Sequence, residues 1–413
     1  MTTTRYFIIE RDPDVDPAPP QPGPGGGLEG FGATPAGAAP PVPAPVKVAT
    51  ADLTAREAAS ERQRSGVRMV GAAMPIRLIA PLDDAPAAPA QPLAGTAWGI
   101  TATQADQTAL DGSGVTVAVL DTGIDKAHPA FAGANLADAD IVDFTGSPQG
   151  ALDLHGHGTH CAGTIFGKDV GGMRIGVARG IGRAMAGKVL SANGGDSAML
   201  FDALQWASRE RCDIVSMSLG FDFPGLVERL ENSGMPKKVA VSTALVAFGQ
   251  NLRAFDTLMA SFRAGEPFGR NMLVVAAAGN ESERQIAASF RISASLPAAA
   301  SGVVSVAAYG EGAGGPGTDF RIAPFSNIDP QIAAPGVGVV SAKLGGGLIG
   351  MNGTSMACPH VAGLAALWWQ KIAQSGETPT PDKVREKMFA NAVTTRLLAD
   401  EIDRGRGRAL APG

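Results

Sequence analysis

The chain has 413 residues, of which 45% are hydrophobic and 18% charged, as is usual for a globular protein with a sizeable core. Its 34 Lys and Arg against 39 Asp and Glu give a net charge of −5, and no basic cluster stands out, so we expect no nucleic-acid partner. No apolar run approaches the roughly 18 to 20 residues of a membrane-spanning helix, which argues against a membrane partner.

Two further features bear on the compartment. The N-terminal apolar run, Tyr6–Ile9, is shorter than the roughly seven residues of a secretory signal. The three cysteines are an odd number and lie far apart, so they predict no disulfide framework and fit a reducing compartment. We therefore expect a cytoplasmic location.

Residues 1–96 are predicted to form a small separate region. Arg5–Glu10 is typical of a strand, Leu53–Ser65 of a helix, and Val67–Pro81 of a strand that continues into an extended tail. Between them, residues 12–46 are dominated by Pro, Ala and Gly, which cannot bury enough apolar surface to offset their ordering entropy. We expect that stretch to be flexible. A second segment of this kind, residues 82–94, leads into the next domain.

Residues 97–413 are predicted to form one larger domain. Short apolar runs rich in Val and Ile are typical of strands buried on both faces of a parallel sheet. These runs are Val115–Leu120, Ile214–Met217, Met272–Ala277 and Val303–Ala308. The helical patterns are Gly158–Phe166, Ser197–Arg209, Thr243–Ala264 and Ser355–Gln374. The alternation predicts an α/β fold with three layers, a mostly parallel sheet flanked by helices.

Three polar segments lie where such a sheet collects catalytic groups. Asp121 follows the strand at 115–120, at the edge where open α/β sheets bind ligands. His157 lies in a glycine-punctuated turn that opens a helix, and Ser355 lies in a Gly-Thr-Ser turn at the start of another. A serine hydroxyl becomes a nucleophile when a base removes its proton and a carboxylate orients that base.

These segments, in this order, resemble the subtilisin-like serine proteases (subtilases) over about residues 98–411. The order Asp, His, Ser is the one known for subtilisin. The resemblance implies a subtilisin-like domain and a serine endopeptidase that hydrolyses protein or peptide substrates through an acyl-enzyme. It also implies that Asp121 orients the imidazole, that His157 is the general base and acid, and that Ser355 attacks the scissile carbonyl.

Two further segments resemble the binding machinery of the family. In Ala-Ala-Ala-Gly-Asn at 276–280, Asn280 would donate its side-chain amide to the oxyanion, beside the backbone N–H of Ser355. Ser-Met-Ser-Leu-Gly at 216–220 resembles the substrate-binding strand. The residues expected on the two sides of the primary specificity pocket are Ser218, Leu219 and Gly220, and Ala277, Ala278 and Gly279.

The histidines His155, His157 and His160 allow another interpretation, a zinc site. Metal-binding helices favour His at i and i+4 with a carboxylate nearby, whereas here glycines separate histidines that are two and three residues apart. We therefore predict no metal. His157 is identified over its neighbours because Gly-His-Gly-Thr-His aligns on the family motif there. His128 and His360 are expected to serve packing or hydrogen bonding.

The chain departs from the family in two places. Many subtilases carry an acidic calcium ligand shortly after the His-Pro that follows the catalytic aspartate, but here Pro129-Ala130-Phe131 has no carboxylate, and the loop at 167–174 lacks the Asn-rich calcium-binding sequence. We expect no required cofactor and no calcium at this usual site; calcium sites elsewhere stay open. Extra residues, roughly Phe221–Ser242, leave from the substrate-binding strand and are expected beside the cleft, as a plain elaboration or as a lid or partner-binding element.

The N-terminal region resembles the inhibitory propeptides of this family, small β-α-β units whose tail enters the active site. Residues 53–81 fit that ending. We expect an autoinhibited precursor, or zymogen, with its own N-terminal region as intramolecular inhibitor and with cleavage within Leu82–Trp98. Pro75 and Pro81 would hinder cleavage of the tail itself. The alternatives are a short inhibitory extension, as in intracellular subtilisins, and a plain flexible tail.

Two rival functions stay open at this point. A catalytically inactive binding protein on the subtilase fold is disfavoured by the intact set of Asp121, His157, Asn280 and Ser355. An esterase with the same triad is disfavoured because α/β-hydrolases carry their triad in the order Ser, Asp, His.

Overall fold

The computed structural model describes residues 3–12, 46–79, 95–266, 269, 271–312 and 319–413. The segments expected to be flexible, 12–46 and 82–94, therefore lie almost entirely outside the described residues. Within the described chain, no helix is long and apolar enough to span a bilayer.

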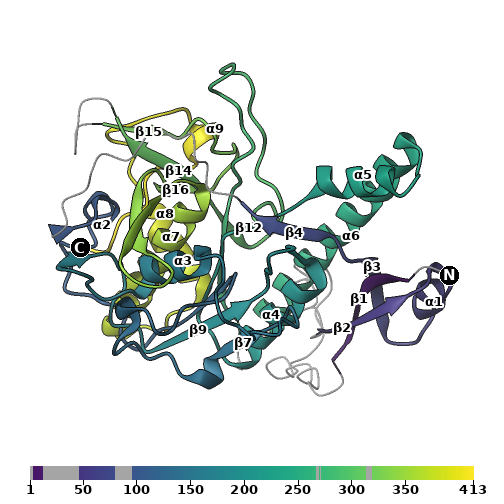
Figure 1. The fold of residues 1–413 in the computed structure, drawn as a ribbon. Coiled ribbons are helices and arrows are strands. Elements are labelled where there is room, and N and C mark those ends of the chain that lie inside the picture. The colour runs from purple at the N-terminus through teal and green to yellow at the C-terminus, as the bar shows by residue number, and fades with distance from the viewer. Residues whose placement is uncertain (1–2, 13–45, 80–94, 267–268, 270, 313–318) are drawn as a thin grey trace, which may run out of the picture.

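A nine-stranded sheet forms the centre of the large domain in the described part of the chain (Figure 1). Neighbouring strands of this sheet are parallel, with one exception: the strands at 320–322 and 303–311 are antiparallel to each other. The order is β19 (Leu397–Leu398), β15 (Phe320–Ile322), β14 (Val303–Glu311), β13 (Leu273–Ala277), β11 (Ile214–Met217), β6 (Thr116–Asp121), β9 (Arg183–Lys188) and β7 (Ile141–Asp143), with β16 (Ile332–Pro335) paired parallel to β14.

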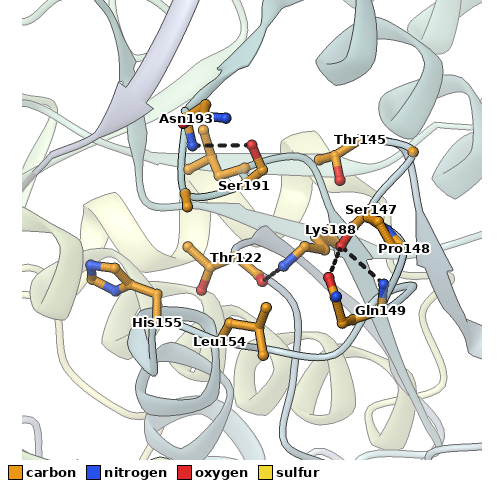
Figure 2. A pocket seen from close by; sticks show the side chains of 13 residues that line it. Thr122, Thr145, Ser147, Pro148, Gln149, Leu154, His155, Lys188, Ser191 and Asn193 are labelled. Carbon is orange, nitrogen blue, oxygen red and sulfur yellow. Dashed lines mark hydrogen bonds between the residues drawn. The ribbon is translucent and has the colours of Figure 1, made fainter.

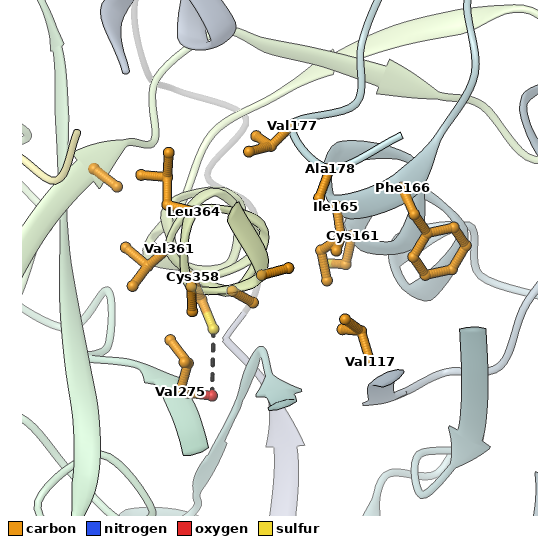
Figure 3. Packing of buried hydrophobic residues seen from close by; sticks show 14 of the residues in the cluster. Val117, Cys161, Ile165, Phe166, Val177, Ala178, Val275, Cys358, Val361 and Leu364 are labelled. Carbon is orange, nitrogen blue, oxygen red and sulfur yellow. Dashed lines mark hydrogen bonds between the residues drawn. The ribbon is translucent and has the colours of Figure 1, made fainter. Parts of the chain in front are cut away.

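Helices cover both faces of this sheet. They are α3 (His157–Phe166) and α7 (Thr354–Gln374) on one face, and α4 (Ser197–Arg209) and α6 (Lys237–Ala264) on the other. Successive side chains of a buried strand point to opposite faces. Accordingly Val117 packs in one hydrophobic cluster with Ile165 and Val361 (Figure 3), and Leu120 packs in the other with Phe201 and Phe255. The predicted three-layer α/β fold is confirmed.

Most predicted elements are present, and the strand at Ile214–Met217 and the helix at Ser197–Arg209 have the predicted bounds. The helix α6 begins at Lys237, earlier than predicted. The sequence pattern missed β9, which has charged ends and small central residues, and several smaller elements. These are α5 (Phe223–Asn232), α8 (Pro381–Ala390), β17 (Val339–Ala342) and β18 (Leu348–Met351).

The N-terminal region forms a small antiparallel sheet with one helix. The strands are β2 (Val46–Leu53), β1 (Thr4–Arg11) and β3 (Val67–Ala72), and the helix is α1 (Ala55–Glu61). A capping box starts α1: the Thr54 hydroxyl accepts the Glu57 N–H while the Glu57 carboxylate accepts the Thr54 N–H. The predicted β-α-β pieces are confirmed, and β2, which was not predicted, completes the sheet.

This small sheet rests on the helices α4 and α6 of the large domain (Figure 1). The Phe7 ring meets Phe201 of α4 edge-on, with the ring centroids 5.1 Å apart. Asn251 of α6 donates from Nδ2 to the Ala72 carbonyl at 2.9 Å. The chain then leaves the small sheet and enters the large domain as β4 (Pro75–Leu78).

Candidate active site

The three predicted catalytic side chains lie at the ends of different elements around the carboxyl edge of the sheet. Asp121 is the last residue of β6, His157 the first of α3, and Ser355 the second of α7. The His157 Nδ1 lies 2.8 Å from the Asp121 Oδ1, and both side chains are buried. Its Nε2 makes no hydrogen bond within the described residues. That nitrogen is therefore the one that can exchange a proton.

Asp153 builds the turn that presents His157. Its carboxylate accepts hydrogen bonds from the hydroxyls of Thr122 and Thr159 and from the backbone N–H of Gly156. Burial by itself would raise the pKa of Asp153, but the hydrogen bonds favour the charged form, so its pKa lies below the ordinary value. Gly156 has φ +95°, which glycine adopts without strain. A role for Asp153 was not predicted, although an Asp three residues before a glycine is a common pattern in turns.

Lys188, at the end of β9, ties two loops of this edge together. Its buried Nζ donates to the carbonyls of Thr122, at 2.7 Å, and Leu152, at 3.0 Å. A pocket of about 390 Å³ opens beside it, lined also by His155 and Ser191 (Figure 2). None of the three predicted catalytic side chains lines this pocket, although His155 and Leu154 of the His157 turn do.

Asn280 lies against the start of α7. Its Oδ1 accepts both the backbone N–H and the hydroxyl of Thr354, each at 2.9 Å. These contacts fix the amide plane with its Nδ2 beside Gly353, where an added Cβ would lie 3.0 Å from that nitrogen. The donor end of Asn280 therefore lies next to the turn that carries Ser355, as an oxyanion donor requires.

Residues 75–79 of the same chain occupy a groove in front of Ser355. The strand β4 lies between β12 (Leu219–Phe221) and β10 (Gly195–Asp196), antiparallel to both, and Arg77 pairs with Gly220. The Ser355 hydroxyl donates to the Ile79 carbonyl at 3.1 Å. Ser355 has no exposed surface in this arrangement. A peptide carbonyl thus lies within hydrogen-bond reach of the serine.

The residues predicted for the specificity pocket are all buried, and Gly220 contacts this segment. The Ile79 side chain is 2% exposed and packs on Gly220, where an added Cβ would lie 3.3 Å from its Cγ1. The Ser218 hydroxyl donates to the Ser355 carbonyl at 2.9 Å. The predicted opposite wall, Ala277, Ala278 and Gly279, is buried and leads directly into Asn280.

Comparison with known proteins agrees with this geometry. The model of the subtilase family matches residues 112–408. The chain belongs to the subtilase family. It is 33% identical over 300 residues to a cuticle-degrading serine protease of Arthrobotrys oligospora, covering 71% of this chain and 59% of that protein.

Two further relatives are bacterial. A thermostable alkaline protease of Halalkalibacterium halodurans is 34% identical over 276 residues, which cover 65% of this chain and 62% of that protein. The major intracellular serine protease of Bacillus subtilis is 30% identical over 262 residues, which cover 62% of this chain and 68% of that protein. The subtilase thus spans about three-fifths of the length of the first two relatives.

The histidine neighbours of His157 do not converge on one point in this subtilase. His155 is exposed, whereas His160 is buried with its Nε2 3.0 Å from the Val339 carbonyl, and burial lowers its pKa to about 3. Within the described chain, the side chains close enough to share a metal are instead Asp121, His157 and Cys161. The geometry therefore gives no support to the zinc interpretation.

His128 and His360 have the hydrogen-bonding roles that the sequence predicted. His128 accepts the Ala130 N–H at Nδ1 and caps a short helical turn. His360 is buried inside α7 with its Nδ1 2.8 Å from the Met356 carbonyl, and burial lowers its pKa to about 4.

Cys161 lies close to both His157 and Ser355, the side chains predicted to be catalytic on α3 and α7. Its Sγ is 3.8 Å from the His157 Nδ1 and donates to the Ser355 carbonyl at 3.4 Å. Burial raises the pKa of this thiol well above its ordinary value, so it stays protonated and packs as a small apolar group. The described cysteines are all free thiols.

The extra residues after Gly220 lie beside the groove, as expected. The helix α5 starts directly after β12, with the Asp222 carboxylate accepting the Gly225 N–H as N-cap. The Asp222 backbone N–H donates to the Pro75 carbonyl at 3.0 Å, so this insertion extends the contact with β4. In Figure 1 the α5 helix projects from the body next to β4 and β12.

The loop predicted to lack calcium carries positive charge. Lys168 donates from Nζ to the Arg179 carbonyl and from its backbone N–H to the Ala130 carbonyl. The Asp169 carboxylate is paired with the Arg179 guanidinium at 2.8 Å. An ammonium and a guanidinium here disfavour a divalent cation, because like charges repel. The absence of calcium from this loop stays a prediction.

Proposed function

We propose that this subtilase is a serine endopeptidase that hydrolyses peptide bonds through an acyl-enzyme. Ser355 is the nucleophile, His157 the general base and then the acid, and Asp121 the group that orients the imidazole. The observation that carries the proposal is the Ile79 carbonyl at 3.1 Å from the Ser355 hydroxyl, because it places a peptide bond at the nucleophile. The buried Asp121–His157 contact supplies the oriented base beside it.

The reaction follows from these positions. His157 takes the hydroxyl proton at Nε2 while the Ser355 oxygen bonds to the carbonyl carbon, and the displaced electron pair goes to the carbonyl oxygen. Asn280 and the Ser355 N–H stabilise that oxyanion. The protonated imidazole, stabilised by Asp121, then gives its proton to the leaving amine. Water, activated by the same imidazole, hydrolyses the acyl-enzyme.

We also propose that residues 1–96 form an inhibitory region and residues 97–413 the catalytic domain of an autoinhibited precursor. The support is the double attachment of the N-terminal region, through its sheet to α4 and α6 and through β4 to the groove. A groove that pairs with one strand has no room for a second. Substrate therefore binds only after residues 75–79 have left.

The register changes the expected site of the first cleavage. The sequence placed it within Leu82–Trp98, mostly outside the described residues. Since the carbonyl at Ser355 belongs to Ile79, we propose that the Ile79–Ala80 bond is cut first. Later trimming can still remove the residues up to Trp98.

Active-site labelling tests the proposed activity. Wild type that has lost its N-terminal region should react with a fluorophosphonate and hydrolyse casein, because both reactions need an activated serine. Ser355→Ala should lose both while its circular dichroism spectrum and thermal midpoint stay unchanged. A folded, processed wild type that neither hydrolyses peptides nor reacts with the fluorophosphonate would favour the inactive binding protein instead.

A further inference from the structure

The Arg77 side chain lies between two carboxylates at the rim of the groove. It belongs to the residue of β4 that pairs with Gly220, two residues before Ile79. Its NH1 is 3.5 Å from the Asp222 Oδ1 and its NH2 is 4.0 Å from the Glu281 Oε1. The guanidinium is half exposed, so it is held by charge and not by burial.

Each of the two carboxylates is held in place by a hydrogen bond from a residue outside β4. The Asp222 carboxylate caps α5 by accepting the Gly225 N–H at 3.0 Å. The Glu281 Oε2 accepts a hydrogen bond from Asn327 Nδ2 at 2.7 Å. The Asp222 and Glu281 side chains are 17% and 34% exposed. A site fixed in this way loses little conformational entropy when a cation binds.

The two carboxylates also come from separate parts of the chain. Asp222 joins the substrate-binding strand β12 to the extra helix α5, and Glu281 follows Asn280 after β13. The two carboxylates come together beside Arg77, which is the third residue before the Ile79–Ala80 bond. The flanking side chains of the bound segment, Ile76 and Ile79, are almost fully buried instead.

We propose that Asp222 and Glu281 form a recognition site for a basic side chain three residues before the scissile bond. The substrate class is then peptides with Arg or Lys at that position, an aliphatic residue just before the scissile bond, and another aliphatic residue four before it. The inference rests on the proposed function, since it takes the bound tail as a guide to how substrate binds.

The expected size of the preference for a basic residue follows from the solvent exposure of the two ion pairs that Arg77 makes. Partly exposed ion pairs contribute modestly, and two of them together correspond to about a three- to tenfold difference in kcat/KM. Mobile ions screen exposed charges, so the preference should shrink as salt is added. A preference based on apolar packing of the arginine stem would not respond to salt.

Chromogenic peptides measure this preference directly. The processed enzyme, made from the full chain, is assayed with Ile-Xaa-Leu-Ile substrates in which Xaa is Arg or its neutral isostere citrulline. The variants are Asp222→Asn and Glu281→Gln, alone and combined, since Asn still caps a helix and Gln still accepts from Asn327. Glu377→Gln, which removes an exposed carboxylate paired with Lys383, is the matched control.

Wild type and Glu377→Gln should prefer Arg about three- to tenfold at low salt. The combined variant should bring the ratio of the two substrates to about one. Equal rates for Arg and citrulline in wild type, or a preference that survives in the combined variant, would overturn the proposal. No hydrolysis of either peptide would instead contradict the proposed function, so the two failures are distinguishable.

Discussion

The central sheet and the N-terminal sheet bury their side chains in different ways. Strands such as β6 and β11 are covered on both faces by helices of their own domain. The N-terminal sheet covers one face with α1, through a small cluster of Ile8, Ala58 and Val70. Its other face, with Phe7 and Ile9, is buried only because α4 and α6 lie against it.

Under the proposed function, this difference would allow the chain to hold residues 1–96 as an inhibitor and later to release them. Most of the core of residues 97–413 is formed by their own side chains, although Phe7, Ile9 and Met74 also pack in the cluster under α4 and α6. The N-terminal region depends on the catalytic domain to bury one face of its sheet. Once the covalent link at the groove is cut, we expect the N-terminal region to be the part that loosens and the catalytic domain to stay folded.

Asn280→Ala should have the largest effect among the following changes, and it should act in the catalytic domain only. Removing one oxyanion donor lowers kcat by about 100- to 1000-fold. Self-cleavage and peptide hydrolysis should slow together, because one site performs both. Time courses of processing and initial rates of peptide hydrolysis measure the two. If processing keeps its normal rate while hydrolysis falls, another protease cuts the precursor.

Phe7→Ala should loosen the N-terminal region and leave the catalytic domain unaffected. Phe7 is fully buried against Phe201, and the loss of such a side chain costs about 3–5 kcal/mol. In a Ser355→Ala background, where no cleavage interferes, hydrogen exchange should speed up in β1 to β3 and stay unchanged in β6 and β11. Phe290→Ala, at a 51% exposed position of the catalytic domain, is the control and should change neither.

Acid should act on two opposing sets of buried groups within the catalytic domain, which contains all five histidines. Burial lowers the folded-state pKa of His160 to about 3 and of His360 to about 4, below the unfolded value near 6.5. Their stabilisation is therefore complete above about pH 6.5 and is lost as the pH falls toward 4, at about 1.4 kcal/mol per pH unit for each histidine.

Two aspartates oppose this loss. Burial raises the folded-state pKa of Asp202 and of Asp213 to about 6, so these groups cost stability above pH 6 and return it as the pH falls toward 4. Wild-type stability should therefore change little between pH 6 and 4. In Asp202→Asn/Asp213→Asn the offset is gone, and thermal midpoints should fall steadily over that range. A flat profile in this variant would mean that the histidines do not resist protonation.

Chelation should have the smallest effect. Because Lys168 lies in the loop at 167–174 and Arg179 pairs with the Asp169 of that loop, we expect EDTA to leave the thermal midpoint of the catalytic domain unchanged. Differential scanning calorimetry with and without added calcium measures this. If calcium raises the midpoint, and Asp169→Asn abolishes the rise, the loop binds calcium after all.

The catalytic domain was largely predictable because its signals are local. Uninterrupted apolar runs predicted β11 and β13, and the helix-opening turns placed His157 and Ser355 at helix starts. The helix α5 was missed because the Pro-Gly pair at 224–225 signals a turn at its start. The strand β2 was missed because it follows the Pro-rich stretch and mixes Lys, Thr and Asp with its apolar residues.

Contacts that depend on strand register could not be predicted. The position of Ile79 at Ser355 depends on how β4 pairs with β12, and no local pattern encodes that pairing. For the same reason, the contact of Arg77 with Asp222 and Glu281, which lie far away along the chain, could not be predicted.

The self-processing of the full chain tests the central proposal most directly. Purified wild type and Ser355→Ala are incubated side by side, and intact mass, new N-termini and peptidase activity are followed in time. Wild type should release a fragment that ends at Ile79 and gain activity as that fragment disappears, while Ser355→Ala stays whole and inactive. Full activity of the uncleaved wild type, or cleavage after Ile79 in purified Ser355→Ala, would contradict an inhibitory tail cut by Ser355.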